Sequence, residues 1–158
     1  MERKDFEQLY IALYPGLYRL ALSILRPEAD AQDAVQQSAV KAWAAADRIR
    51  PGNERAYITR IVVNECRNVQ RHRLRILPVE KTGDTADLSQ QPDMELKAVV
   101  DSLPETLRLP LLLRYMEGYS EKEAAAILRI PLNTLKARLK RARAKLRDEW
   151  IETQEETI

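Results

Sequence analysis

Apolar residues recur every three or four positions along most of the chain, a spacing typical of helices that bury one side. In the first predicted helix, residues 3–26, the apolar positions are Phe6, Leu9, Tyr10, Leu13, Leu17, Leu20, Ala21 and Ile24. We expect Pro15 with Gly16 to kink this helix or to divide it in two, and Pro27 to end it. The chain is therefore predicted to begin with a long amphipathic helix.

Two further helices are predicted before the chain changes in character. The second covers residues 28–46, with the apolar set Ala31, Ala34, Val35, Ala39, Ala42 and Trp43. The third covers residues 55–74, with the buried set Tyr57, Ile58, Ile61, Val62, Cys66 and Val69. The Pro-Gly-Asn sequence at residues 51–53 predicts a loop between them, over residues 47–54. Together the three helices are predicted to form a first domain, residues 1–75.

The second half of the chain is predicted to be a separate helical domain. Residues 76–93 are polar and acidic, and we expect a linker without a core of its own. The second domain covers residues 94–150 and starts with a short helix over residues 95–103. The next helix begins at Pro104 and ends at Gly118, a plausible residue for a helix C-terminus. Its predicted packing residues are Leu107, Leu111, Leu112 and Tyr115.

Residues 120–150 predict a helix, a short turn and a second helix. Ser120 and Glu123 form a capping box at the start, and Pro131 suits the first turn of the following helix. One buried stripe along that second helix consists of Leu135, Leu139, Ala142 and Leu146. The remaining positions are strongly basic: Lys136, Arg138, Lys140, Arg141, Arg143, Lys145 and Arg147. Beyond them, residues 151–158 are acidic and are predicted to be a frayed tail.

A rigid basic rod that follows a capped helix and a short turn is typical of a recognition helix in the major groove of DNA. A merely solvated helix, a membrane-surface helix or a calmodulin-like target would also be basic. A membrane-surface helix, however, needs bulky apolar residues, whereas this apolar stripe is narrow and includes alanine. Those alternatives also leave the preceding helix and turn without a role. DNA recognition is therefore the favoured interpretation.

The distribution of charge supports this interpretation. The formal net charge is only +2, but residues 105–150 carry eleven Lys/Arg against six Asp/Glu, and residues 76–104 carry two against six. The third helix is also basic on the side opposite its apolar residues. Segregated positive charge is the electrostatic signature of a nucleic-acid-binding protein. The chain thus contains two basic helices that lie far apart in the sequence.

The sequence lacks the side chains of an enzyme or of a metal centre. Cys66 is the single cysteine and His72 the single histidine, which stands in an arginine-rich run and is expected to belong to a basic surface. This excludes a disulfide framework, a zinc site built on two or more His or Cys, and a Cys/His or Ser/His/Asp catalytic set. We expect no cofactor and no enzymatic activity. The apolar runs are far shorter than the roughly 20 residues that a membrane span needs, and no signal peptide is present, so we expect a cytoplasmic protein without membrane insertion.

The chain resembles an extracytoplasmic-function (ECF) sigma factor of the sigma-70 family. These proteins are minimal bacterial promoter-recognition subunits that contain only the second and fourth sigma regions. Residues 17–43 resemble the family's core-binding helices, residues 56–73 its promoter-melting helix, and residues 103–147 its helix-turn-helix. The resemblance implies an all-α fold of two small helical domains joined by a flexible linker. It also implies three partners: core RNA polymerase, promoter DNA as duplex and as melted non-template strand, and an anti-sigma factor.

The resemblance assigns a role to several groups of residues. Those that would face the clamp helices of the polymerase large subunit are Asp30, Asp33, Gln36 and Gln37. A loop that captures a base flipped from the minus-10 element would contain Arg48, Ile49, Arg50 and Asn53. The separated non-template strand would contact Arg60, Asn64, Arg67, Asn68 and Arg71. Recognition of the minus-35 element would involve Asn133, Thr134, Lys136, Ala137, Arg138, Lys140, Arg141 and Lys145.

The chain departs from the family pattern at a few positions. Tyr57 stands where tryptophan is usual, and Asn133 and Ala137 stand where glycine and serine are usual. Arg129 replaces a common turn glycine, and a positive φ there would cost about 1 kcal/mol or more. The alternative function is a dimeric helix-turn-helix regulator that is not a polymerase subunit, but such a protein does not need the basic helix of the first domain. A pure protein-interaction module would leave both basic helices unexplained.

Overall fold

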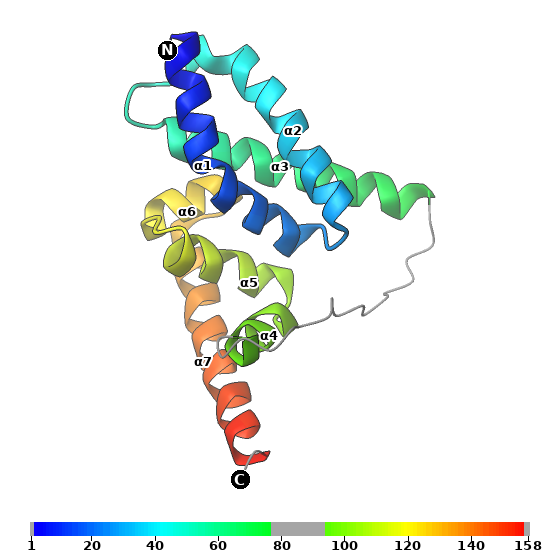
Figure 1. Ribbon diagram of the computed structural model, residues 1–158. Coiled ribbons are helices and arrows are strands. Elements are labelled where there is room, and N and C mark those ends of the chain that lie inside the picture. The colour runs from blue at the N-terminus through cyan, green and yellow to red at the C-terminus, as the bar shows by residue number, and fades with distance from the viewer. Residues whose placement is uncertain (1, 77–93, 157–158) are drawn as a thin grey trace. The chain divides into compact units, whose positions relative to one another are not determined.

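The computed structural model describes residues 2–76 and 94–156, and every regular element within these two stretches is a helix. The α-helices are α1 (Arg3–Ile24), α2 (Glu28–Ala45), α3 (Glu54–Ile76), α4 (Met94–Ser102), α5 (Glu105–Leu111), α6 (Glu121–Leu128) and α7 (Leu132–Glu156). Two short elements follow α2 and α5: the 3-10 helix η1 (Ala46–Arg48) and the π-helix η2 (Leu112–Met116). The helices form two compact units, one built mainly from α1–α3 and the other mainly from α4–α7 (Figure 1). The predicted all-α fold is confirmed, and the predicted linker after Ile76 lies outside the described residues.

The first unit is a bundle in which α1, α2 and α3 each contact the other two. Its buried residues include Phe6, Leu17, Leu20, Ala34, Val35, Ile58, Val62 and Cys66. Pro15 lies inside α1, which is one helix over its whole length, so the predicted possibility of two separate helices is wrong. Pro27 immediately precedes α2, and its carbonyl accepts from Asp30 N and Ala31 N at 3.1 Å each. The chain therefore reverses between the two helices within a few residues.

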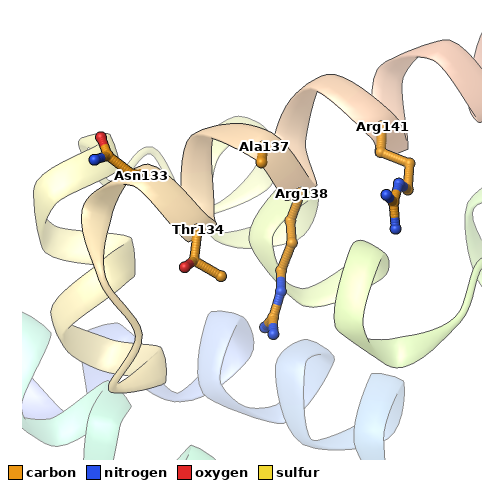
Figure 2. A pocket seen from close by; sticks show the side chains of 5 residues that line it. All are labelled: Asn133, Thr134, Ala137, Arg138 and Arg141. Atoms are coloured by element: carbon orange, nitrogen blue, oxygen red, sulfur yellow. The ribbon is translucent and has the colours of Figure 1, made fainter.

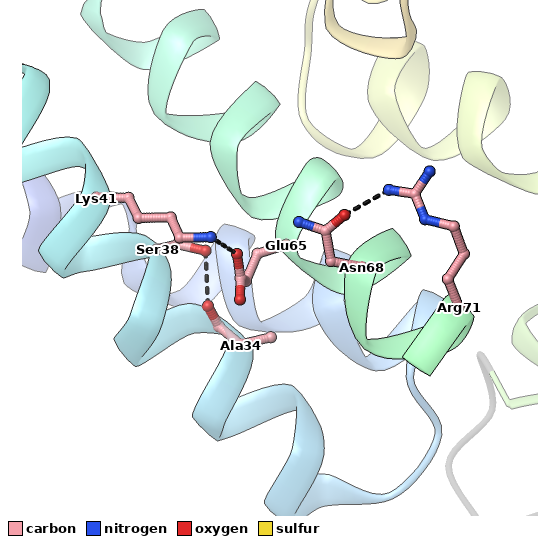
Figure 3. Close-up of polar contacts among 6 residues, drawn as sticks. All are labelled: Ala34, Ser38, Lys41, Glu65, Asn68 and Arg71. Atoms are coloured by element: carbon pink, nitrogen blue, oxygen red, sulfur yellow. Dashed lines mark hydrogen bonds and ion pairs between the residues drawn. The ribbon is translucent and has the colours of Figure 1, made fainter. Parts of the chain in front are cut away.

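Polar contacts also connect the helices of the first unit. Tyr10 Oη on α1 donates to the Val35 carbonyl on α2 at 2.6 Å. The pKa of Tyr10 is raised, mainly because the hydroxyl is buried and to a lesser extent because Tyr14 is close. Ser38 is fully buried within α2 and donates to the Ala34 carbonyl at 2.6 Å (Figure 3). A serine can stand in this core because its hydroxyl bonds to the preceding helical turn.

The second unit has its core between α4, α5 and α7. Leu103, Leu107, Leu111 and Ala142 form a buried cluster, against which Val100 and Leu146 pack. Arg108 on α5 is also buried, with 7% of its surface exposed, and its Nη1 donates to the Leu103 carbonyl at 2.7 Å. This carbonyl lies just past the end of α4, where backbone acceptors lack partners within the helix and a positive charge is favourable. The predicted buried stripe of α7 is confirmed, since Leu135 and Leu139 are fully buried.

The α5 helix does not continue as an α-helix, and this changes which side chains are buried. Pro110 has no N–H, and the residues that follow it form η2, where Glu117 N donates to the Leu112 carbonyl five positions earlier at 3.0 Å. The wider turn shifts the helical register, so that Leu113 is fully buried and Tyr115 is 55% exposed. The prediction that Tyr115 packs in the core is therefore wrong, because it assumed a regular α-helix as far as Gly118.

The start of α6 has the predicted capping box. Glu123 N donates to Ser120 Oγ at 3.1 Å, and Ser120 N donates to Glu123 Oε1, also at 3.1 Å. These two bonds satisfy backbone donors that have no partner inside the helix. At the other end of the second unit, α7 continues to Glu156. Residues 151–156 are therefore helical, and the prediction of a frayed tail is wrong for them.

The turn between α6 and α7 has an unfavourable residue at a left-handed position. Arg129 has a φ of 56°, and no other non-glycine residue has a positive φ within the described stretches. Its N–H donates to the Ala126 carbonyl at 3.2 Å, and Ile130 N donates to the Ala125 carbonyl at 3.0 Å. This is the usual way to end a helix, but glycine is the residue that adopts it without a steric penalty. The condition under which backbone strain was expected at Arg129, a positive φ, is therefore met.

Replacing Arg129 with glycine should raise the free energy of unfolding by about 1 kcal/mol, because the Cβ that disfavours the left-handed conformation is removed. Arg129→Ala is the matched control: it removes the guanidinium but keeps the Cβ, and it should give no such gain. Urea denaturation followed by circular dichroism measures both variants. An equal gain in the two variants would attribute the effect to the charge and contradict the explanation from backbone strain.

Candidate nucleic-acid and polymerase interfaces

The buried stripe of α7 determines which of its residues face outward. Successive residues of an α-helix are turned by about 100°, so Asn133, Ala137 and Lys140 lie opposite Leu135 and Leu139. All three are exposed. Two basic flanks lie between this outer face and the core. The first flank contains Thr134, Arg138, Arg141 and Lys145, and the second contains Lys136, Arg143 and Arg147.

Five of the predicted DNA-contacting residues on α7 come together around one pocket (Figure 2). They are Asn133, Thr134, Ala137, Arg138 and Arg141. Figure 2 shows Thr134, Arg138 and Arg141 projecting from α7 to the same side, as expected for positions separated by four and three residues. The three other predicted residues, Lys136, Lys140 and Lys145, are exposed and do not line this pocket.

The C-terminal half of α7 is held against the rest of the second unit. Helices α4 and α5 both contact α7. Ser102 Oγ, at the end of α4, donates to Glu149 Oε2 on α7 at 2.8 Å. Leu146 packs against the core cluster. The orientation of the basic flanks is therefore fixed by contacts along much of the helix.

The basic face of α3 contains the five residues predicted to contact single-stranded DNA. Helical spacing brings Arg60, Asn64, Arg67, Asn68 and Arg71 to one side of the helix. Arg60, Asn64 and Arg67 are half-buried. Asn68 and Arg71 are exposed. Asn68 Oδ1 accepts a hydrogen bond from Arg71 Nη2 (Figure 3). The face thus combines guanidinium donors, which suit phosphates, with amides, which can pair with base edges.

The loop that precedes α3 has a defined conformation. Gly52 has a φ of 89°, its N–H donates to Glu54 Oε1 at 3.0 Å, and Asn53 N donates to the Arg50 carbonyl at 3.1 Å. Arg50 and Asn53 are exposed, as is Arg48 on η1. Ile49 lies in the same loop, but only 9% of its surface is exposed, so its side chain is buried in the protein. Its burial anchors the loop to the first unit, whereas its polar neighbours remain exposed.

The acid and amide residues of α2 divide into two groups. Asp33, Gln36 and Gln37 are exposed, whereas Asp30 is half-buried and forms an ion pair with Arg73 of α3. A second ion pair between the same two helices joins Lys41 to Glu65 (Figure 3). The two pairs hold α2 against α3 on one side. Asp30 therefore has an intramolecular partner that the sequence did not reveal.

An apolar residue belongs to the same exposed surface of α2. Val40 is 66% exposed and lies seven positions after Asp33, which brings it to the same side of the helix. We define the α2 face as Asp33, Gln36, Gln37 and Val40. Val40 is not among the residues predicted from the sequence for this surface, which are all polar. Its spacing from Asp33 nevertheless places it on the same side of the helix.

The structure provides no candidate for a metal centre or a membrane span within the described residues. Among those side chains, no group of three or more His, Cys, Asp and Glu residues could hold a metal ion. None of the helices in the two described stretches is both long enough and apolar enough to cross a bilayer. Cys66 is fully buried in the first unit.

Two family models match the chain, in the same order as the two units. The model described as Sigma-70 region 2 matches residues 9–76. The model described as Sigma-70, region 4 matches residues 93–146. The first match contains the α2 face and the whole basic face of α3, and the second contains α6 and most of α7.

Individual relatives are similar over most of their length. The ECF RNA polymerase sigma factor EcfG of Rhodopseudomonas palustris (strain TIE-1) is 33% identical over 144 residues, which cover 86% of this chain and 80% of that protein. The ECF RNA polymerase sigma-E factor of Escherichia coli (strain K12) is 33% identical over 163 residues, which cover 90% of this chain and 84% of that protein. Among solved structures, the sigma factor RpoE from Bartonella quintana, in complex with the anti-sigma factor NepR, matches with a TM-score of 0.77 and 29% identity over 92% of this chain and 96% of that chain.

Proposed function

The chain belongs to the extracytoplasmic-function (ECF) sigma factors of RNA polymerase, and we propose that its two units recognise different parts of a promoter. As a sigma factor it acts with core RNA polymerase and directs the initiation of transcription. The observation that carries the proposal is that each of the two family matches contains an outward-facing basic helix, α3 in the first and α7 in the second. Two separate DNA-binding surfaces fit a promoter made of two elements.

The second unit binds the duplex of the upstream, minus-35 element through α7. The outer face of Asn133, Ala137 and Lys140 enters the major groove, where base edges present a distinct pattern for each base pair. The two basic flanks then point toward the two phosphate backbones that border the groove. Each phosphate contact releases counterions, so the affinity falls as the salt concentration rises. The three exposed or partly exposed arginines and lysines of each flank make this dependence strong.

The first unit binds the minus-10 element through the loop before α3 and the basic face of α3. Arg48, Arg50 and Asn53 border a position where an extruded base can be held, and unpaired bases are recognised through their edges and by stacking. Asn64 and Arg67 on α3 contact the backbone and bases of the non-template strand next to it. Ile49 stabilises the loop from inside. This division assigns promoter melting to the first unit.

The α2 face binds core RNA polymerase. Its carboxylate and amide oxygens accept hydrogen bonds from an arginine-rich helical surface, and exposed Val40 adds apolar area at the centre of the contact. Asp30 contributes less directly, since Arg73 already occupies its carboxylate. The ion pairs Asp30–Arg73 and Lys41–Glu65 keep α2 fixed on α3, so the surface is preorganised for its partner.

The sigma factor supplies recognition, and the polymerase supplies the chemistry of RNA synthesis. Because it works on the polymerase, we place the protein in the cytoplasm. A protein that covers the same surfaces would keep it inactive. The similar RpoE structure is a complex with the anti-sigma factor NepR, and we infer that an anti-sigma factor also regulates this chain.

Reconstitution with purified core RNA polymerase tests the proposed function. The full-length chain should form a stoichiometric complex with core polymerase, and the complex should select and transcribe promoters from a randomised duplex library. Core polymerase alone is the control. A chain that binds duplex DNA as a dimer but does not associate with core polymerase would overturn the proposal in favour of an ordinary helix-turn-helix regulator.

A further inference from the structure

An exposed tyrosine in the second unit contacts two arginines that come from different elements. Tyr115 on η2 accepts a hydrogen bond at its Oη from Nη1 of Arg143 on α7, with a donor–acceptor distance of 2.6 Å. The guanidinium carbon of Arg114 lies 5.6 Å from the centroid of the Tyr115 ring, within range of a cation–π interaction. We define Arg114, Tyr115 and Arg143 as the Tyr115 cluster.

The π-helix explains why this tyrosine reaches α7 along the protein surface. In a regular α-helix the apolar spacing predicts Tyr115 in the core, but the wider turn of η2 places Leu113 there instead. Tyr115 is left 55% exposed and next to Arg143. Single π-turns inside helices are frequent at functional sites, because they redirect side chains at a cost in stability.

The hydrogen-bonding capacity of the cluster is suited to an anion. The Tyr115 oxygen accepts from Nη1 of Arg143, and this bond fixes the guanidinium beside η2. Arg143 uses one of its five N–H donors in this bond. The remaining donors of a guanidinium form a planar fork that matches two oxygens of a phosphate group. The cluster therefore brings two arginines together around one tyrosine, which fixes the guanidinium of Arg143 by a hydrogen bond.

The position of Arg143 relates the cluster to the DNA-binding helix. Arg143 lies on the second flank of α7, seven residues after Lys136 and four before Arg147. The contact with Tyr115 shows that this flank is the one turned toward η2. When the outer face of α7 enters the major groove, one sugar-phosphate backbone of the DNA runs past each flank. Arg114 and Tyr115 on η2 extend the second flank, so they lie on the side of one of these backbones.

We propose that Tyr115 is a positioning residue that fixes the Arg143 guanidinium, and that the Tyr115 cluster holds one backbone phosphate of the upstream promoter duplex. This inference rests on the proposed role of α7. Phosphate contacts set the register of a protein on DNA without selecting sequence. The cluster therefore contributes affinity and orientation, while the outer face of α7 provides discrimination.

A double-mutant cycle on the full-length chain assembled with core polymerase tests the inference. Tyr115→Phe removes the hydroxyl but keeps the ring beside Arg114, and Arg143→Gln removes the charge. Titrations at several salt concentrations use a duplex that the wild-type holoenzyme selected from a random pool, and a scrambled duplex. Tyr115→Phe should weaken binding to both duplexes by about three- to tenfold, the size of one hydrogen bond. Arg143→Gln should reduce the slope of log affinity against log salt concentration by about one, because one phosphate contact is lost. Tyr115→Phe should reduce the same slope in the same direction, since the guanidinium is no longer fixed.

The combination of the two changes separates positioning from independent contacts. Adding Tyr115→Phe to Arg143→Gln should cause no further loss if the hydroxyl acts through the guanidinium. Additive losses, or a Tyr115→Phe variant with wild-type affinity and salt slope, would overturn the inference. Tyr14→Phe, at an exposed tyrosine of the first unit, is the control for the loss of a hydroxyl elsewhere. Failure of the proposed role of α7 would look different from failure of this inference. In that case Lys145→Ala and Arg141→Ala would leave duplex binding unchanged as well.

Discussion

Asp33→Arg and Gln36→Arg should each reduce binding to core RNA polymerase by about 100-fold or more, which would abolish holoenzyme formation at working concentrations. Both side chains are exposed on the α2 face. An arginine at either position would meet the arginine-rich partner surface that the acid and amide oxygens are proposed to bind. Placing like charges in contact at an interface costs several kcal/mol, far more than the loss of one rim hydrogen bond. Charge reversal is therefore a stronger test than replacement by alanine.

The fold of the first unit should survive both substitutions. Neither side chain contributes to the buried core, whose α2 members are Ala31, Ala34, Val35, Ser38 and Ala42. The ion pairs that join α2 to α3 involve Asp30 and Lys41 and remain intact. Surface substitutions away from such features usually change stability by less than about 0.5 kcal/mol. A loss of polymerase binding would thus report on the interface and not on unfolding.

Competition with wild-type chain for a limiting amount of core polymerase measures the effect. Thermal melting of each variant verifies that the helices remain folded. Glu7→Arg is the matched control, because it introduces an arginine in place of an exposed acid on α1 of the same unit. If Asp33→Arg and Gln36→Arg formed holoenzyme with wild-type affinity, the assignment of the α2 face to polymerase would be wrong.

Features that depend on local sequence could be predicted well. The periodic apolar positions gave the helices of both units to within a few residues of their observed ends, except that α7 continues to Glu156. The capping box of Ser120 and Glu123 depends on two side chains and the backbone between them, so it follows from the sequence alone. For Arg129 the resemblance to the family, in which a turn glycine is common at that position, indicated where a positive φ would cause strain, and Arg129 has a φ of 56°. Outward residues of α7 followed from its buried stripe.

Features that depend on how one helix meets another could not be predicted in the same way. The Asp30–Arg73 ion pair joins residues that are 43 positions apart, and nothing near Asp30 in the sequence indicates its partner. Burial of Arg108 depends on the end of α4 lying beside α5, where its guanidinium finds a backbone carbonyl. The exposure of Val40 and the burial of Ile49 likewise depend on which neighbouring segments cover each side chain, so the residue type alone does not predict them. For Tyr115, a π-turn after Pro110 altered the register on which the periodic argument depends.

The first flank of α7 should contain two kinds of basic residue with different effects on DNA binding. Arg141 borders the pocket formed with Asn133, Thr134, Ala137 and Arg138 (Figure 2), near the part of the helix that is proposed to enter the groove. Arg141→Ala should cost about 1–3 kcal/mol with the selected duplex and relax the preference at one position of the upstream element. Lys145 lies one turn further along, where the helix is proposed to leave the groove. Lys145→Ala should weaken binding to all sequences about equally and reduce the salt slope by about one.

Titration of each variant against the selected duplex and a set of single-mismatch duplexes, at several salt concentrations, distinguishes the two roles. Both side chains are exposed, so neither change should disturb the packing of Leu139 and Ala142 beneath them. Ala144→Ser is a control at an exposed position of the same helix that carries no charge. A base contact changes the ratio of affinities for matched and mismatched duplexes, whereas a phosphate contact leaves that ratio unchanged. If Arg141→Ala lowered every affinity by the same factor, Arg141 would be a phosphate contact, and base recognition would have to come from the outer face of Asn133, Ala137 and Lys140 alone.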